Sequence, residues 1–303
     1  ASPPGVGSGF GSDSERDAMN SSRMPVAFLG HGNPMNALQK NRYTEAWRIF
    51  GATVPRPSAI LVISAHWYTN ATAVTAMPRP RTIHDFYGFP QELFDVQYPA
   101  PGSPQVAELV ADVCKPRWVG QDIDSWGIDH GTWSVLLHAF PDASIPVVQL
   151  SLNAFKDLDH HLELGRKLSP LRDEGVLIIG SGNIVHNLRA VDYRQPDSGY
   201  DWALRFDAAA REALQGSPTD VAALDAHPDF ARAVPTPDHF LPLLYTAGLA
   251  GDEPFDLLVD GHAAGSISMA AYTLGLECDL GASSDTSPAA PLPDGFPTAD
   301  SNL

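Results

Sequence analysis

The sequence has little cysteine and few basic residues, and each shortage excludes a class of protein. The two cysteines, Cys114 and Cys278, lie far apart and show no CxxC spacing, which excludes a cysteine-based zinc ribbon and a disulfide framework. Only 19 lysines and arginines stand against 36 acidic residues, for a formal net charge of −17. Nucleic acid and anionic membranes are therefore not expected as partners, because both need a basic surface. No apolar run is long enough to cross a bilayer.

Several catalytic signatures are also missing. The chain has no GxSxG elbow, no Walker loop and no GxGxxG turn. A serine hydrolase, a nucleotide hydrolase and a Rossmann dehydrogenase are therefore unsupported.

The two ends of the chain are poor in apolar residues. Residues 1–23 are rich in Gly and Ser and lack the apolar core of a secretory signal, so we expect a disordered leader. Residues 281–303 are rich in Ser, Pro, Ala and Asp, which predicts a disordered tail. One domain over 24–280 remains, and a cytoplasmic location is expected by default.

Between the ends, apolar runs of strand type alternate with stretches of helical spacing. The run from Ala59 to Ala65 is continuous and β-branched, as in a parallel strand buried on both faces. This alternation predicts an α/β fold, a single domain with a largely parallel central sheet flanked by helices. Further strands are expected over 25–30, 72–76, 145–150, 176–179, 255–259 and 267–274. Helices are expected over 36–50, 103–114, 133–140, 158–171, 200–214 and 239–247, with a long irregular loop over 79–102.

Four histidines stand at the loop ends of apolar segments, where the sites of open α/β sheets form. His31 and His66 follow strand-like runs, His186 lies four residues after the Gly180-Ser-Gly182 turn, and His239 precedes an apolar stretch. Because histidine is the commonest metal ligand, the pattern indicates a mononuclear metal enzyme with its site at the carboxyl ends of the strands. His130, in Asp129-His130-Gly131, suits an acid–base role and a simple helix start equally well.

Ordered motifs give the chain a resemblance to a known family. Leu-Gly-His31-Gly-Asn-Pro, Ser-Ala-His66-Trp, Ile-Asp-His130-Gly-Thr-Trp, Gly-Ser-Gly-Asn-Ile-Val-His186-Asn and His239-Phe-Leu-Pro follow one another along the chain. Together they resemble the class III extradiol ring-cleavage dioxygenases, in particular the 4,5-DOPA extradiol dioxygenase group, over about residues 24–276.

The resemblance implies one non-haem metal per chain, with His31, His66 and His239 as ligands. His186 would be a fourth ligand when zinc fills the site, or an acid–base residue when iron binds substrate, and His130 would contact substrate or dioxygen. The implied reaction inserts O2 into a catechol ring (DOPA or a similar catechol), gives a muconic semialdehyde and needs Fe(II), although Zn(II) can occupy the isolated protein.

Two other functions remain open at the level of sequence. A zinc-dependent hydrolase could use the same histidines to activate a water, but no HExxH motif supplies its carboxylate. A closed four-ligand zinc site would instead indicate a binding protein without catalysis. The physiological catechol, the position of ring cleavage and the oligomeric state are not encoded in any pattern that we recognise.

Overall fold

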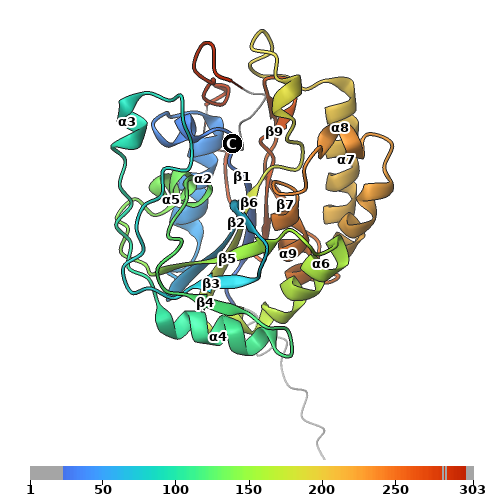
Figure 1. Cartoon of the computed structure of the whole chain (residues 1–303). Coiled ribbons are helices and arrows are strands. Elements are labelled where there is room, and N and C mark those ends of the chain that lie inside the picture. The colour runs from blue at the N-terminus through green and yellow to red at the C-terminus, as the bar shows by residue number, and fades with distance from the viewer. Residues whose placement is uncertain (1–22, 282, 284, 298–303) are drawn as a thin grey trace, which may run out of the picture.

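The computed structural model describes residues 23–281, 283 and 285–297, and an eight-stranded sheet forms its centre (Figure 1). The strands from β5 to β1 in spatial order pair in parallel, and β10 and β7 extend that edge antiparallel. This confirms the predicted α/β fold. In spatial order the strands are β4 (Gly120–Asp122), β3 (Ala73–Thr75), β5 (Val147–Asn153), β2 (Ala59–Thr69), β6 (Val176–Gly182), β1 (Val26–Gly30), β10 (Ala271–Leu274) and β7 (Asp256–Val259).

Helices cover both faces of the sheet (Figure 1). The α-helices are α2 (Arg42–Thr53), α3 (Gln91–Phe94), α4 (Pro104–Cys114), α5 (His130–Ala139), α6 (Leu158–Lys167), α7 (Asp201–Gln215), α8 (Phe230–Ala233) and α9 (Leu241–Ala250). Short 3-10 helices are η1 (Pro34–Ala37), η2 (Ser169–Glu174), η3 (Leu188–Ala190) and η4 (Pro218–Ala226), and a small ribbon pairs β8 (His262–Ala263) with β9 (Ile267–Ser268). None of the helices in the described ranges has the length and apolar character that a bilayer span requires.

Alternation along the central strands builds two separate cores. In β1, Val26 and Phe28 pack into one apolar cluster, whereas Ala27 and Leu29 pack into the cluster on the opposite face. Successive side chains of a strand point to opposite faces. A strand covered on both sides must therefore be apolar at every position, and this explains why the central strands are visible in the sequence.

The strand β2 differs from its prediction, because it runs through His66 to Thr69 and does not end at Ala65. Its pairing with β5 jumps from Ile63–Leu150 to Tyr68–Leu152, so β2 has extra residues between these two pairs. Such bulges re-aim side chains and occur beside active sites. His66 therefore lies within an irregular strand and not in the turn that we predicted.

The described end of the chain contacts the domain. Residues 285–297, which we call the C-terminal strap, pack on the domain, and the side chains of Ala289, Ala290 and Phe296 are buried. The backbone N–H of Ala290 donates to Asn36 Oδ1 at 2.8 Å. The structure thus places this part of 281–303 against the domain, and the disorder expected from its composition stays a prediction. Residues 298–303, and residues 1–22 of the expected leader, lie outside the described residues.

Candidate metal centre

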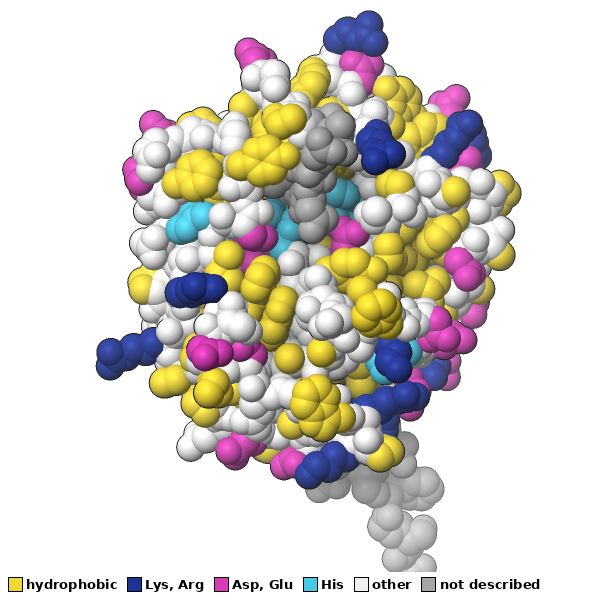
Figure 2. All heavy atoms as spheres, in the orientation of Figure 1, with side chains coloured by type: hydrophobic (Ala, Val, Ile, Leu, Met, Phe, Trp, Pro, Cys, Tyr) yellow, Lys and Arg dark blue, Asp and Glu magenta, His cyan; other side chains and the backbone are white. Residues whose placement is uncertain are grey.

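Five buried histidines meet at the carboxyl ends of the central strands. His31 directly follows β1, His66 lies in the bulge of β2, and His186 follows β6. His130 is the first residue of α5, whose N-cap is Asp129, and His239 lies just before α9. Histidine side chains are visible on this face among acidic and apolar side chains (Figure 2). The four predicted metal ligands and the predicted substrate contact therefore share one location.

The ring centres of three predicted ligands lie at nearly equal separations. The ring centres of His31, His66 and His239 are separated by 5.1, 5.3 and 5.0 Å, a nearly equilateral triangle. Imidazoles bound at about 2.05 Å to one ion have ring centres about 4.5 to 5.2 Å apart, for angles between 90° and tetrahedral. The triangle has the dimensions of a three-histidine metal site.

The nitrogen atoms of His31 and His66 fit the same geometry. Their Nε2 atoms lie 3.1 Å apart, whereas two nitrogens bound to one ion at about 2.05 Å would be about 2.9 to 3.3 Å apart. Two imidazoles that face each other with Nε2 atoms this close are suited to bind a cation between them.

His130 forms a second three-histidine set with the same pair. The ligand nitrogens of His31, His66 and His130 lie within 4.8 Å of one another. Its ring centre, however, is 3.8 Å from that of His66 and 6.0 Å from that of His31. This uneven spacing differs from the regular triangle of the first set. His130 Nε2 is buried and has no hydrogen-bond partner among the described residues.

Neighbouring polar groups orient two of the predicted ligand histidines. His31 Nδ1 lies 2.9 Å from Ser181 Oγ on β6, and that hydroxyl in turn donates to the carbonyl of Gly131. Since the hydroxyl proton is used there, Ser181 accepts from the Nδ1–H of His31, which leaves Nε2 with its lone pair. His239 Nδ1 likewise bonds to the Asp238 carboxylate. Such partners of the second nitrogen fix the metal-binding tautomer.

A single carboxylate serves the other two rings. Asp85 Oδ1 lies 2.9 Å from His130 Nδ1 and accepts the backbone N–H of His130 at 3.0 Å. Its Oδ2 lies 3.5 Å from His66 Nδ1. Burial would raise the pKa of Asp85, but the charge and hydrogen bonds of His130, together with the charge of His66, outweigh it and lower the pKa. Asp85 is therefore ionised at neutral pH and faces both rings.

Burial keeps the ligand histidines neutral. It lowers the pKa of His31, His66 and His239 well below the ordinary value, and the charges of the neighbouring histidines lower it further. A neutral imidazole is the form that binds a metal. Protonation of these histidines is therefore unfavourable, and their neutral nitrogens can together bind a cation.

His186 lies beside this triangle. Its ring stacks on that of His239, with centres 3.5 Å apart and planes at 4°. Its backbone N–H donates to the carbonyl of Ala233. The stacking holds the His186 ring in a plane parallel to that of His239, which suits a proton-transfer group beside the predicted metal site. A role as fourth ligand would need the His186 ring to turn, because a metal lies in the plane of each imidazole that binds it.

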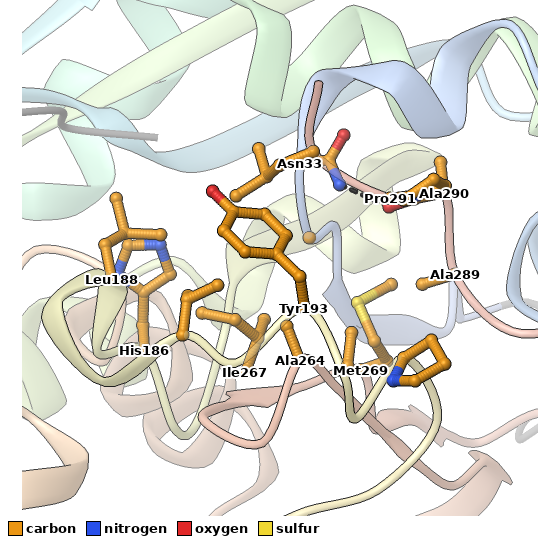
Figure 3. A pocket seen from close by; sticks show the side chains of 15 residues that line it. Asn33, His186, Leu188, Tyr193, Ala264, Ile267, Met269, Ala289, Ala290 and Pro291 are labelled. Atoms are coloured by element: carbon orange, nitrogen blue, oxygen red, sulfur yellow. Dashed lines mark hydrogen bonds between the residues drawn. The ribbon is translucent and has the colours of Figure 1, made fainter. Parts of the chain in front are cut away.

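An apolar pocket opens beside His186 (Figure 3). Its wall includes Gly32, which is adjacent to His31. It also includes Ile267 of β9 and Met269, which lies between β9 and β10. Figure 3 shows Ala289 and Ala290 of the C-terminal strap on the side of the pocket opposite His186. Of the five clustered histidines, His186 is the one that lines this pocket.

The sequence did not identify the groups that orient the histidines. No pattern in the sequence marks Asp85 or Asp238 for this role. Ser181 was expected in a Gly-Ser-Gly turn, whereas it lies within β6, which runs to Gly182. His84, in the loop over 79–102, places its Nε2 2.8 Å from the carbonyl oxygen of Val96.

The sequence of residues 26–275 matches the family described as the catalytic LigB subunit of aromatic ring-opening dioxygenase. The chain is 49% identical over 263 residues to the 4,5-DOPA dioxygenase extradiol of Escherichia coli K12, covering 85% of this chain and 97% of that protein. It is 38% identical over 257 residues to the 4,5-DOPA dioxygenase extradiol of Beta vulgaris, covering 81% of this chain and 94% of that one.

A solved structure agrees with these sequence matches. The crystal structure of an uncharacterized protein from Escherichia coli K12 superimposes with a TM-score of 0.73 and 43% sequence identity. The match covers 83% of this chain and 99% of that one. The structural match and the family match therefore both extend over most of the described residues.

Proposed function

Because this chain belongs to the LigB family of aromatic ring-opening dioxygenases, we propose that it is an extradiol dioxygenase acting on a catechol. It would insert O2 into the ring of DOPA or a similar catechol next to a hydroxyl-bearing carbon and give a muconic semialdehyde. The regular triangle of His31, His66 and His239 is the observation that carries this proposal. The cytoplasmic location expected from the sequence stays a prediction.

The residues present fit a single non-haem metal ion. We propose His31, His66 and His239 as its ligands, with His186 as a fourth ligand when the ion is zinc. The support is the 3.1 Å separation of two Nε2 atoms and the buried Nε2 of His239, which has no hydrogen-bond partner in the described part of the chain. Fe(II) held in this way would supply open coordination positions and redox chemistry, neither of which a closed zinc site offers.

The chain's own residues would manage the protons of the reaction. A catechol that binds through both oxygens must lose protons, and His186, beside the triangle, is positioned to accept one. His130 would return a proton during ring cleavage, because its Nε2 is buried in the cluster while its Nδ1 faces Asp85. A histidine oriented by a carboxylate is a common general acid–base arrangement.

The site also excludes bulk water from the reacting groups. All five histidines are at most 9% exposed, and Phe86 packs edge-on against His130 with ring centres 5.4 Å apart. Burial of this kind holds substrate and dioxygen as an oriented pair and limits side reactions.

Oxygen consumption tests the proposal directly. Protein loaded anaerobically with Fe(II) is expected to take up O2 with DOPA or a simple catechol and to develop the yellow colour of the cyclised product, whereas protein loaded with Zn(II) is expected to do neither. Absence of uptake with both metals over a panel of catechols would refute the dioxygenase and leave the zinc hydrolase to be tested with esters and amides.

A further inference from the structure

The apolar pocket beside His186 indicates which catechols this chain prefers. We propose that the pocket holds the ring substituent of the catechol and that Ala289 and Ala290 close it. The preferred substrate then carries a short uncharged alkyl substituent and not a charged side chain. This inference rests on the proposed function.

The pocket lies where a ring substituent would project from the cluster. His186 is shared by both, because it lines the pocket and stacks on His239. On the other side, Gly32 follows His31, and a Cβ on Gly32 would lie 2.5 Å from Met269 Sδ. A catechol held at the histidines would therefore meet the cavity at His186, where Figure 3 shows the apolar walls beginning.

The chemistry of the walls selects against charge. Hydrocarbon side chains, among them Leu188, Val191 and Ile267, make up most of the lining, and its described residues include no Asp, Glu, Lys or Arg. A carboxylate or an ammonium group placed there would lose water without gaining a counter-ion, which is costly. An alkyl group has no charge to desolvate, so its transfer from water to these apolar walls is favourable.

The strap is held firmly enough to form a wall. The backbone of Ala290 donates to Asn36 Oδ1 and accepts from the side-chain amide of Asn33. Further along, the ring of Phe296 lies 4.9 Å from that of Phe89. The strap also lies beyond residue 275, where the family match ends, so this wall is an addition to the shared domain.

The size of the pocket follows from two small side chains. Ala289 and Ala290 are 4% and 3% exposed, and both line the cavity. Any larger side chain at either position would occupy the space that a substituent needs. Ile267 lines the same cavity and limits its depth.

Binding to iron-loaded protein in the absence of O2 tests this inference without turnover. Isothermal calorimetry would compare catechol, 4-methylcatechol, 4-ethylcatechol, 4-propylcatechol and DOPA. We expect Kd to fall by about fourfold for each added carbon, the value of one buried methylene. DOPA, whose side chain carries an ammonium and a carboxylate on a chain of three carbons, should bind at least tenfold more weakly than 4-propylcatechol.

Variants locate the effect in the pocket. Ala290→Leu should reduce the ratio of the catechol Kd to the 4-propylcatechol Kd by at least tenfold. Ile267→Ala should extend the gain in affinity to alkyl chains longer than propyl. Thr286→Leu is the matched control, because Thr286 is exposed on the same strap and does not line the pocket. It should give the affinities of the parent chain.

Two outcomes would overturn the inference: equal affinities along the alkyl series, or tighter binding of DOPA than of 4-propylcatechol. An unchanged order of affinities in Ala290→Leu would do the same. Oxygen uptake by the iron-loaded protein, measured on the same compounds, tests the reaction separately. The expected affinity order without any uptake would refute the proposed function and uphold the pocket.

Discussion

The hydroxyl of Ser181 should control metal affinity, although it would not contact the metal. Ser181 is buried on β6, accepts from His31 Nδ1 and donates to the carbonyl of Gly131. In Ser181→Ala, the Nδ1–H of His31 would lack a partner, at a cost of about 1–3 kcal/mol. The metal-free protein can relieve this cost by moving the ring proton to Nε2, but then Nε2 cannot bind a cation.

The cost of removing the Ser181 hydroxyl therefore differs between the metal-free and the metal-bound protein, and this difference lowers the affinity for metal. The metal-bound form must keep the proton on Nδ1, so it bears the full cost that the metal-free form avoids. We expect Zn(II) affinity to fall about 10- to 100-fold, the usual effect of removing a group that supports a metal-ligating histidine. Competition with a chromophoric chelator measures the change, and chemical denaturation measures the stability of the metal-free protein.

Ser151→Ala is the matched control. Ser151 is fully buried on β5, where its hydroxyl donates to the carbonyl of Ala71 and accepts the N–H of Ala73. Each variant leaves a buried carbonyl without its hydroxyl donor, that of Gly131 or that of Ala71, so both should lose about 1–3 kcal/mol of stability in the metal-free form. Only Ser181→Ala should lose metal affinity. Equal metal affinities in the two variants would refute the argument.

Three further predictions follow from the same structure. His239→Ala should lose the metal whereas His130→Ala should retain it and lose turnover, as metal analysis after dialysis would show; the reverse result would favour the second three-histidine set. Burial lowers the pKa of His161 to about 4, below its unfolded value near 6.5. The unfolded chain therefore binds more protons between these values, and this residue should cost about 3 kcal/mol of stability as the pH falls from 6.5 to 4. His161→Gln should flatten that part of the curve of unfolding free energy against pH, and an unchanged slope would contradict the assignment. A Cβ on Gly182 would lie 2.3 Å from the carbonyl oxygen of His239, and one on Gly51 would lie 1.9 Å from that of Ala139. Both alanine variants should be less stable by about 1–3 kcal/mol, but only Gly182→Ala should also weaken metal binding, and equal metal affinities would contradict the role of Gly182.

The sheet and the histidine cluster could be predicted because burial leaves a direct record in the sequence. The parallel strands β2 and β6 are covered on both faces, so they appear as continuous apolar runs. Parallel strands bring their carboxyl ends to one edge of the sheet. A histidine just after such a run, as His31 is, was therefore expected to meet others from neighbouring strands.

The supporting groups could not be predicted, because they depend on contacts between elements far apart in the chain. Ser181 and His31 are separated by 150 residues and meet through the parallel pairing of β1 with β6. Asp85 reaches His130 from the aromatic loop, 45 residues away. Nothing in the local pattern distinguishes this Ser and this Asp from the many others in the chain.

The C-terminal strap is a second part of the site that the sequence did not predict. Its composition predicts disorder, yet the buried side chains of Ala289 and Ala290 complete a wall of the pocket next to His186. The histidine cluster can thus be predicted from the strand ends, whereas the proposed substrate pocket also needs a segment that the sequence pattern does not place. We therefore expect metal binding and substrate preference in this protein to be separable. Substitutions at Ser181 should alter the first, and substitutions at Ala290 should alter the second.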